Sequence, residues 1–170
     1  LHSFPTRRSS DLHIDPDDLR ASTYYISLFS AQKNLKGTYS GTIYPFSGLA
    51  TDELFLIRAE SNAFADNITA AMNDLNTLVA MRFRTGTFVP LTAATKEEAL
   101  RLIRDERRKE LAFRGLRWPD LRRFNKENEQ ITLTRTLNGT VHTLPPNSNL
   151  YVLPLPPEVV SLGKLVDNIR

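Results

Sequence analysis

The spacing of apolar residues over positions 68–79 constrains the fold more than any other feature of this sequence. These residues recur at intervals of three and four, and they are Ile68, Ala71, Met72, Leu75, Leu78 and Val79. This period matches one face of an α-helix and excludes a strand, whose side chains alternate with a period of two. We therefore predict an amphipathic helix that buries this face.

A second helix is predicted just before it. Thr51 can cap its first turn, while Asp52 and Glu53 suit the positive end of the helix dipole. Asp66 and Asn67 break the pattern before the next helix. One face carries Leu54, Ile57, Ser61 and Phe64, and the small residues that would let another helix approach are Ala59, Ala63 and Ala65. The two helices form a hairpin of tetratricopeptide size, and we expect the neighbour that covers its second face to lie upstream of residue 1.

A third helix is predicted to extend to about residue 113, and it contains the densest run of charged residues in the chain. Thr95 and Glu98 match a capping box, and Gly115 stands where a left-handed residue ends a helix. A helical wheel places on one face the residues Leu100, Ile103, Arg107, Glu110, Leu111 and Arg114. The opposite face carries charges of alternating sign, typical of a solvated ladder: Glu97, Arg101, Asp105 and Lys109.

The charges on the apolar face of this helix have two interpretations. Contact with phosphate or nucleic acid is disfavoured, because acidic residues interleave the bases and would repel phosphates. We predict instead that the face holds buried ion pairs, with Arg107 as a structural arginine. Its expected partners are Glu110, three residues further on, and Asp120, after the corner at Gly115.

The remaining segments complete a mainly α fold. Residues 118–124 are predicted to form a short helix, with Pro119 at an early position where its missing N–H costs little. Residues 131–137 and 140–144 alternate around Asn138-Gly139, a pair that favours a type I′ turn. We therefore predict a tetratricopeptide-like helical hairpin plus further helices, a small β-hairpin and an irregular proline-rich tail over 150–170 with one helical turn. Little regular structure is expected before residue 50.

Charge and composition narrow the function classes. The chain has 22 Lys and Arg against 19 Asp and Glu, and this net charge of +3 is too small to indicate a nucleic-acid partner. The absence of cysteine excludes thiolate catalysis and cysteine-based metal sites. His2, His13 and His142 are scattered, without carboxylates at ligand spacing, so no metal site is predicted. Neither a nucleophile elbow nor a phosphate-binding loop is present, so we predict no catalytic residue and no cofactor.

Aromatic residues are the remaining candidates for contact with a ligand. Trp118 has the chemistry to stack on a sugar ring, but its place in a tight helix–Gly–helix corner favours the core beside Leu121 and Phe124. The tyrosines that are also candidates are Tyr24, Tyr25, Tyr39, Tyr44 and Tyr151. The sequence does not rank them, and the ligand-binding residues stay open.

Three segments of the chain resemble the SusD/RagB family. They are residues 51–60 (TDELFLIRAE), residues 95–123 (TKEEALRLIRDERRKELAFRGLRWPDLRR) and the ending 153–168 (LPLPPEVVSLGKLVDN). The middle segment is the most specific, because it is long and irregular in composition. The ending departs from the family pattern at 161–163, where an Asn-rich stretch is usual. On this resemblance residues 13–170 are the C-terminal part of a SusD/RagB-like domain. We interpret residues 1–12, which lack periodicity, as a non-native scar or a disordered terminus.

The resemblance also implies a location and a partner. Such proteins are surface-exposed at the outer membrane of Gram-negative bacteria, held by an N-terminal lipid anchor that this chain does not contain. They bind glycans or other nutrients and act as a lid on a SusC-like TonB-dependent transporter. Much of the family's ligand surface would lie upstream of this chain, and no ligand residue of the family maps onto a motif here.

Two other function classes stay open. A helical-repeat scaffold for protein–protein contact, without glycan binding, would be indicated by a parent gene that lacks a lipoprotein signal. A carbohydrate-processing enzyme would need a converging pair of carboxylates. The helical wheel places no two free carboxylates toward a common cleft, so we expect a binding protein and no catalysis.

Overall fold

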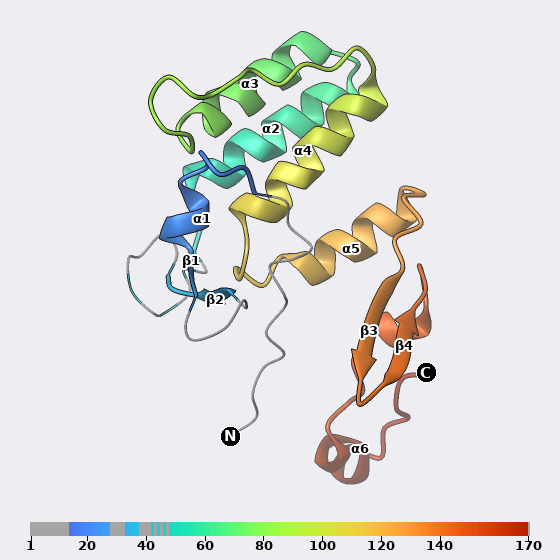
Figure 1. Cartoon of the computed structure of the whole chain (residues 1–170). Helices are drawn as coiled ribbons and strands as arrows, with labels where there is room; N and C mark the ends of the chain where they lie inside the picture. The colour runs from blue at the N-terminus through green and yellow to red at the C-terminus, as the bar shows by residue number, and fades with distance from the viewer. Residues whose placement is uncertain are drawn as a thin grey trace. The chain divides into compact units, whose positions relative to one another are not determined.

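The computed structural model describes residues 14–27, 33–37, 42, 44, 46 and 48–169, and the chain divides into two compact units. The first unit, Leu1–Gly115, contains α1 (Arg20–Thr23), β1 (Tyr25–Ser27), β2 (Lys33–Leu35), α2 (Thr51–Phe64), α3 (Ile68–Ala80) and α4 (Lys96–Glu110). The second, Leu116–Arg170, contains α5 (Arg117–Lys126), β3 (Leu133–Leu137), β4 (Thr140–Leu144), the 3-10 turn η2 (Asn149–Tyr151) and α6 (Pro157–Gly163) (Figure 1). The predicted mainly α fold is confirmed. The segment interpreted as a scar, together with His2, His13 and Tyr39, lies outside the described residues.

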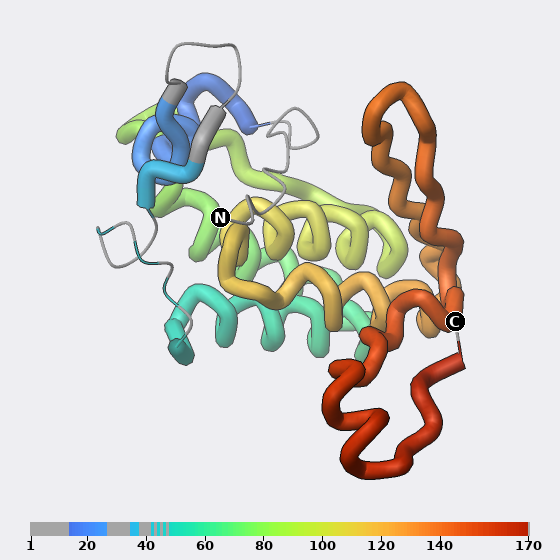
Figure 2. Tube along the Cα trace, turned by 90° about the horizontal axis from the view of Figure 1, so that it is seen from below, coloured from blue at the N-terminus to red at the C-terminus, as the bar shows by residue number. Residues whose placement is uncertain are grey.

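Helices α2 and α3 form the predicted hairpin, and α4 contacts both of them (Figure 1, Figure 2). Asp66 turns the chain with a φ of 59°, and the Asn67 side chain caps α3 by accepting a hydrogen bond from the Ala70 N–H at 3.4 Å. The buried face of α3 follows the predicted period, with Ala71, Met72, Leu75, Leu78 and Val79 inside. The helical periodicity of the sequence therefore predicted the buried face of α3 correctly.

The small residues Ala59 and Ala63 of α2 are buried, as predicted for a face that another helix approaches. Leu54, Ile57 and Phe64 are 63%, 48% and 42% exposed. The inward face instead carries Leu56 and the small residues Ala59 and Ala63, all essentially inaccessible to solvent. Small side chains let the neighbouring helices approach closely, so the packing of the hairpin selects this face over the bulkier one.

The ends of the helices differ in detail from the prediction. Thr51 is the first residue of α2 and not its cap, because Ala50 occupies the capping position without any side-chain hydrogen bond. Thr95 caps α4 as predicted, with its Oγ1 accepting from the Glu98 N–H at 3.2 Å. The Glu98 carboxylate completes the capping box one residue early, by accepting from the Ala94 N–H at 2.8 Å.

Helix α4 ends three residues earlier than predicted, at Glu110. Gly115 has the expected positive φ of 77°, and Phe113 also has a positive φ, of 62°. Two left-handed residues therefore make the corner after α4, which shortens the last helical turn.

The segment before α2 contains more regular structure than the sequence indicated. After the short helix α1, the strands β1 and β2 pair antiparallel with Ile26 opposite Asn34. The Leu19 N–H donates to the Arg82 carbonyl at 2.7 Å, and Asp18 forms an isolated bridge with Phe83. These backbone contacts hold α1 against the chain that leaves α3.

The second unit contains the predicted β-hairpin. Asn138 and Gly139 have φ values of 48° and 80°, as a type I′ turn requires, and Arg135 lies opposite His142. Most residues of both strands are exposed on both faces. The tail is extended around its prolines, as predicted, but α6 spans seven residues and not a single turn.

Candidate functional site

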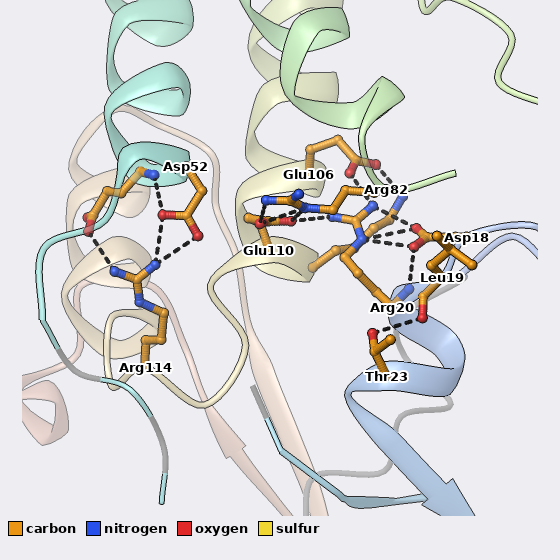
Figure 3. Close-up of polar contacts among 11 residues, drawn as sticks. Asp18, Leu19, Arg20, Thr23, Asp52, Arg82, Glu106, Glu110 and Arg114 are labelled. Atoms are coloured by element: carbon orange, nitrogen blue, oxygen red, sulfur yellow. Dashed lines mark hydrogen bonds and ion pairs between the residues drawn. The ribbon is translucent and has the colours of Figure 1, made fainter. Parts of the chain in front are cut away.

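Glu110 is the centre of a buried ion-pair cluster at the end of α4 (Figure 3). Its side chain has no solvent exposure and accepts hydrogen bonds from two arginines that are distant in sequence. The Arg20 Nη1 donates at 3.0 Å, and Arg82 donates from Nη2 at 2.6 Å and from Nε at 2.9 Å. One carboxylate therefore joins α1, the end of α3 and the end of α4.

Arg20 connects Glu110 to two further carboxylates. Its Nη2 donates to Asp18 Oδ2 at 2.6 Å and to Glu106 Oε2 at 2.8 Å. Burial alone would lower the pKa of Arg20, but the hydrogen bonds and charges of Asp18 and Glu106 outweigh it and raise that pKa above its usual value. Lys109, predicted on the solvated ladder, is half-buried and pairs with Glu106 at 2.5 Å, so that assignment is wrong.

A second ion-pair cluster joins α4 and the corner after it to the start of α2. Arg114 donates from Nη1 to both Asp52 oxygens at 3.1 Å (Figure 3). Its Nη2 donates to the Gly48 carbonyl at 2.8 Å. Arg107 is 8% exposed and donates to Glu53 at 3.1 Å. The prediction of a buried, paired Arg107 is therefore confirmed, but this bond goes to α2, while Glu110 is engaged by Arg20 and Arg82.

These two clusters indicate that the charged motif of α4 has a structural role. An unpaired charge is costly in an interior, and every buried carboxylate named above accepts from at least one cation. A carboxylate held between guanidinium groups is a poor general base. The buried carboxylates of the two clusters therefore do not suit the acid–base chemistry of glycoside hydrolysis.

The sequence analysis missed several members of the clusters, among them Asp18, Arg20, Asp52 and Arg82. Arg20 lies 86 positions from Glu106 and 90 from Glu110. Local periodicity carries no signal over such separations. A weak signal existed in Asp52, which was assigned only to the helix dipole although it stands one turn before the buried Leu56.

The candidate tyrosines occupy different environments. Tyr25 is buried and packs edge-on against Phe113, with ring centroids 6.3 Å apart. Tyr24 is half-buried, and burial together with the negative charge of Glu110 raises its pKa to about 12. Tyr44 is mostly exposed. The first two are therefore parts of the packed structure, whereas Tyr44 projects from it.

Trp118 contacts Tyr151 within the second unit. Their ring centroids lie 4.9 Å apart at 42°, and the indole Nε1 donates to the Tyr151 carbonyl at 3.1 Å. The buried Asn125 links α5 to Tyr151 a second time. Its Nδ2 donates to the Tyr151 hydroxyl at 3.3 Å and also to the Ile131 carbonyl at 3.1 Å. With its ring packed at a tilt against Tyr151 and its N–H bonded, Trp118 has the contacts of a packing residue more than those of an open sugar platform.

A basic hollow on α5, which we call the α5 cavity, is the candidate for ligand contact. It has a volume of about 300 Å³ and is lined by Pro119, Arg122, Arg123 and Lys126. Arg123 pairs with Glu127 at 3.3 Å and lies 4.6 Å from the centre of the Phe124 ring. The cavity was not predicted, because its cations lie close together only on the exposed face of the folded helix.

The described residues contain neither a cluster of metal ligands nor a helix that could span a membrane. Over these ranges, no three His, Asp or Glu side chains gather as metal ligands would. His142 is exposed on β4. Across the same part of the chain, none of the helices has both the length and the apolar character needed to cross a bilayer.

Comparison with known proteins supplies a family and solved structures that are similar to this chain. The profile of the SusD family matches residues 16–168 of the chain. A SusD-like protein from Bacteroides fragilis, solved by crystallography, is 26% identical with a TM-score of 0.49. The alignment covers 74% of this chain and 27% of that protein, so the chain spans about a quarter of its relative. Among curated proteins, no sequence matches.

Proposed function

The chain belongs to the SusD family, whose members bind glycans or other nutrients, and from this premise we propose that it is part of a cell-surface nutrient-binding protein. The observation that carries the proposal is the family match over residues 16–168. That range includes the charged motif of α4, whose residues make the two ion-pair clusters. The most specific part of the sequence therefore contributes to the scaffold of a binding protein.

The proposed partner is a SusC-like TonB-dependent transporter of the outer membrane. In this role the whole protein is held at the cell surface by a lipid anchor and delivers its ligand to the transporter. Family membership supports both the location and the partner. The ligand is a glycan or another nutrient, and no nucleic acid is involved.

A binding role without catalysis is also part of the proposal. The carboxylates of α4 that would be candidates for acid–base chemistry are engaged by Arg20, Arg82 and Lys109. Retaining and inverting glycosidases both need two carboxyl groups that face the scissile bond. The ion pairs therefore support a protein that holds its ligand unchanged.

The transporter role can be tested by purification from native membranes. A tag is placed on the protein that contains this chain, outer membranes are solubilised in mild detergent, and co-purifying proteins are identified by mass spectrometry. We expect a TonB-dependent transporter in stoichiometric amount, and an unrelated surface lipoprotein carrying the same tag serves as the control. Recovery without any transporter would contradict delivery to one.

The second candidate is a helical-repeat scaffold for protein–protein contact. The exposed Leu54, Ile57 and Phe64 on α2 favour it, because an apolar helix face in water is typical of a stacking surface. The same purification separates the two functions. A scaffold would recover a protein other than a transporter and would retain no glycan.

A further inference from the structure

The α5 cavity gathers positive charge on one short helix. Helix α5 has the sequence RWPDLRRFNK, with four basic residues and one acidic residue. Three of the basic residues, Arg122, Arg123 and Lys126, line the same hollow of about 300 Å³. Part of this charge suits the negative end of the helix dipole, because Arg123 and Lys126 lie in the last turn. The dipole does not account for Arg122, nor for the grouping around a cavity.

Arg122 and Lys126 lack acidic partners. They are four positions apart on the helix, where like charges repel each other. Within the described residues neither makes an ion pair or a side-chain hydrogen bond, and both are exposed. The acidic groups near the cavity, Asp120 and Glu127, lie 3.8 Å and 3.3 Å from Arg123. An anion in the cavity would therefore relieve a repulsion that the chain itself leaves in place.

Arg123 is restricted by contacts with its neighbours on α5 and just after it. It pairs with Glu127 at 3.3 Å and lies over the Phe124 ring, and Phe124 itself is buried. A guanidinium held in this way loses less side-chain entropy when it binds an anion. The planar guanidinium fork matches a carboxylate or a sulfate group, and the lysine adds a charge without strict geometry.

We propose that the α5 cavity binds the carboxylate or sulfate group of an acidic glycan. The proposal rests on the proposed nutrient-binding function and names a class of ligand for it. The volume lies at the small end of the range for small-molecule sites, which suits one charged sugar unit of a longer chain.

An anionic membrane surface offers similar charges but fits this helix poorly. A helix that lies on a bilayer inserts large apolar side chains beside its basic residues. Of the large apolar residues of α5, Leu121 and Phe124 are buried at 0% and 2% exposure, and the Trp118 ring packs against Tyr151. The cavity itself is lined by three basic residues and Pro119, so it presents no large apolar side chain to enter lipid.

Isothermal titration calorimetry on the 170-residue chain tests the assignment. The probes are a sulfated hexasaccharide derived from heparin, neutral maltohexaose, and vesicles that contain phosphatidylglycerol. The cavity variant combines Arg122→Gln with Lys126→Gln. The matched control combines Arg135→Gln with Lys164→Gln, which removes the same two charges from exposed positions elsewhere in the second unit. Circular dichroism checks that both variants keep the fold.

We expect the chain to bind the sulfated hexasaccharide, with an affinity that falls as salt concentration rises. The cavity variant should bind it at least about tenfold more weakly, and the control variant within about twofold of the parent chain. Equal losses in both variants would overturn the assignment, because they indicate a general charge effect. Binding to vesicles alone, or no binding to the sulfated probe, would overturn it as well. Binding of maltohexaose that neither variant changes, together with no binding of the sulfated probe, would remove the acidic-glycan site and leave the nutrient-binding function standing. That function is judged separately by the purification of the transporter.

Discussion

Arg82 and Glu110 form a forked ion pair between the ends of α3 and α4. The Arg82 Nη2 and Nε lie 2.6 Å and 2.9 Å from Glu110 Oε1, and hydrogen bonding to Glu110 raises the pKa of Arg82. Because Arg20 binds the same carboxylate from α1, three elements meet at one buried group. The geometry predicts that Glu110 fixes how these elements dock.

Replacing Glu110 by alanine should be among the most destabilising single changes in the first unit. The change leaves two arginines around a site without its carboxylate, and the loss of one member of a buried pair costs roughly 3–5 kcal/mol. Glu97→Ala, at an exposed position of the same helix, should cost less than about 1 kcal/mol. Urea unfolding followed by circular dichroism compares them, and similar losses would show that Glu110 is not the centre of the cluster.

The same comparison applies to two arginines of α4. Arg107→Ala removes a buried partner of Glu53 and should cost roughly 3 kcal/mol, at the lower end of the range because Arg114 remains 3.5 Å from Glu53. Arg101→Ala, on the exposed face, should cost well under about 1 kcal/mol. The midpoints of urea unfolding provide the measurement. A reversed order would mean that the two faces of α4 are wrongly assigned.

Gly139→Val should destabilise the β-hairpin by more than about 1 kcal/mol, because a β-branched residue resists the positive φ of 80° at this position. Thr140→Val, one residue further on in an exposed strand, should leave the melting temperature nearly unchanged. Thermal unfolding of the two variants is the test. An unchanged melting temperature for Gly139→Val would contradict the turn.

Stability should fall at alkaline pH partly through Tyr24. The tyrosine pKa is 10.0 in the unfolded reference and about 12 in the folded chain. Between these values the folded state holds more protons than the unfolded state, so the free energy of unfolding decreases as pH rises from 10 to 12. Tyr24→Phe should reduce this loss, and Tyr44→Phe, at an exposed site, should not. Urea titrations at pH 8 and pH 11 measure the difference, and identical pH dependence in all three chains would contradict it.

Helical periodicity predicted the parts of the fold that depend on local spacing. The buried residues of α3, the two faces of α4 and the Asn138-Gly139 turn each follow from neighbours within a few positions. The inward face of α2 was predicted in part, since Ala59 and Ala63 were expected where another helix approaches. The burial of Leu56 on that face was not predicted, because it depends on the packing of α2 against α3 and α4.

The partners within the ion-pair clusters could not be predicted from local sequence patterns. A helical wheel showed that Arg107 had to be paired, but the choice between Glu110 and Glu53 depends on how α2 packs against α4. The α5 cavity is a similar case. Its basic residues are visible in the sequence, but the burial of Phe124 and the exposure of Arg122 are properties of the folded unit.

We propose that this chain belongs to a protein that binds its ligand without changing it. The direct test incubates the whole native protein with a mixture of glycans, recovers the bound fraction and measures its masses by mass spectrometry. We expect retained glycans with the same masses as the starting material. Shortened or modified products that form reproducibly, and that scale with protein concentration, would contradict it.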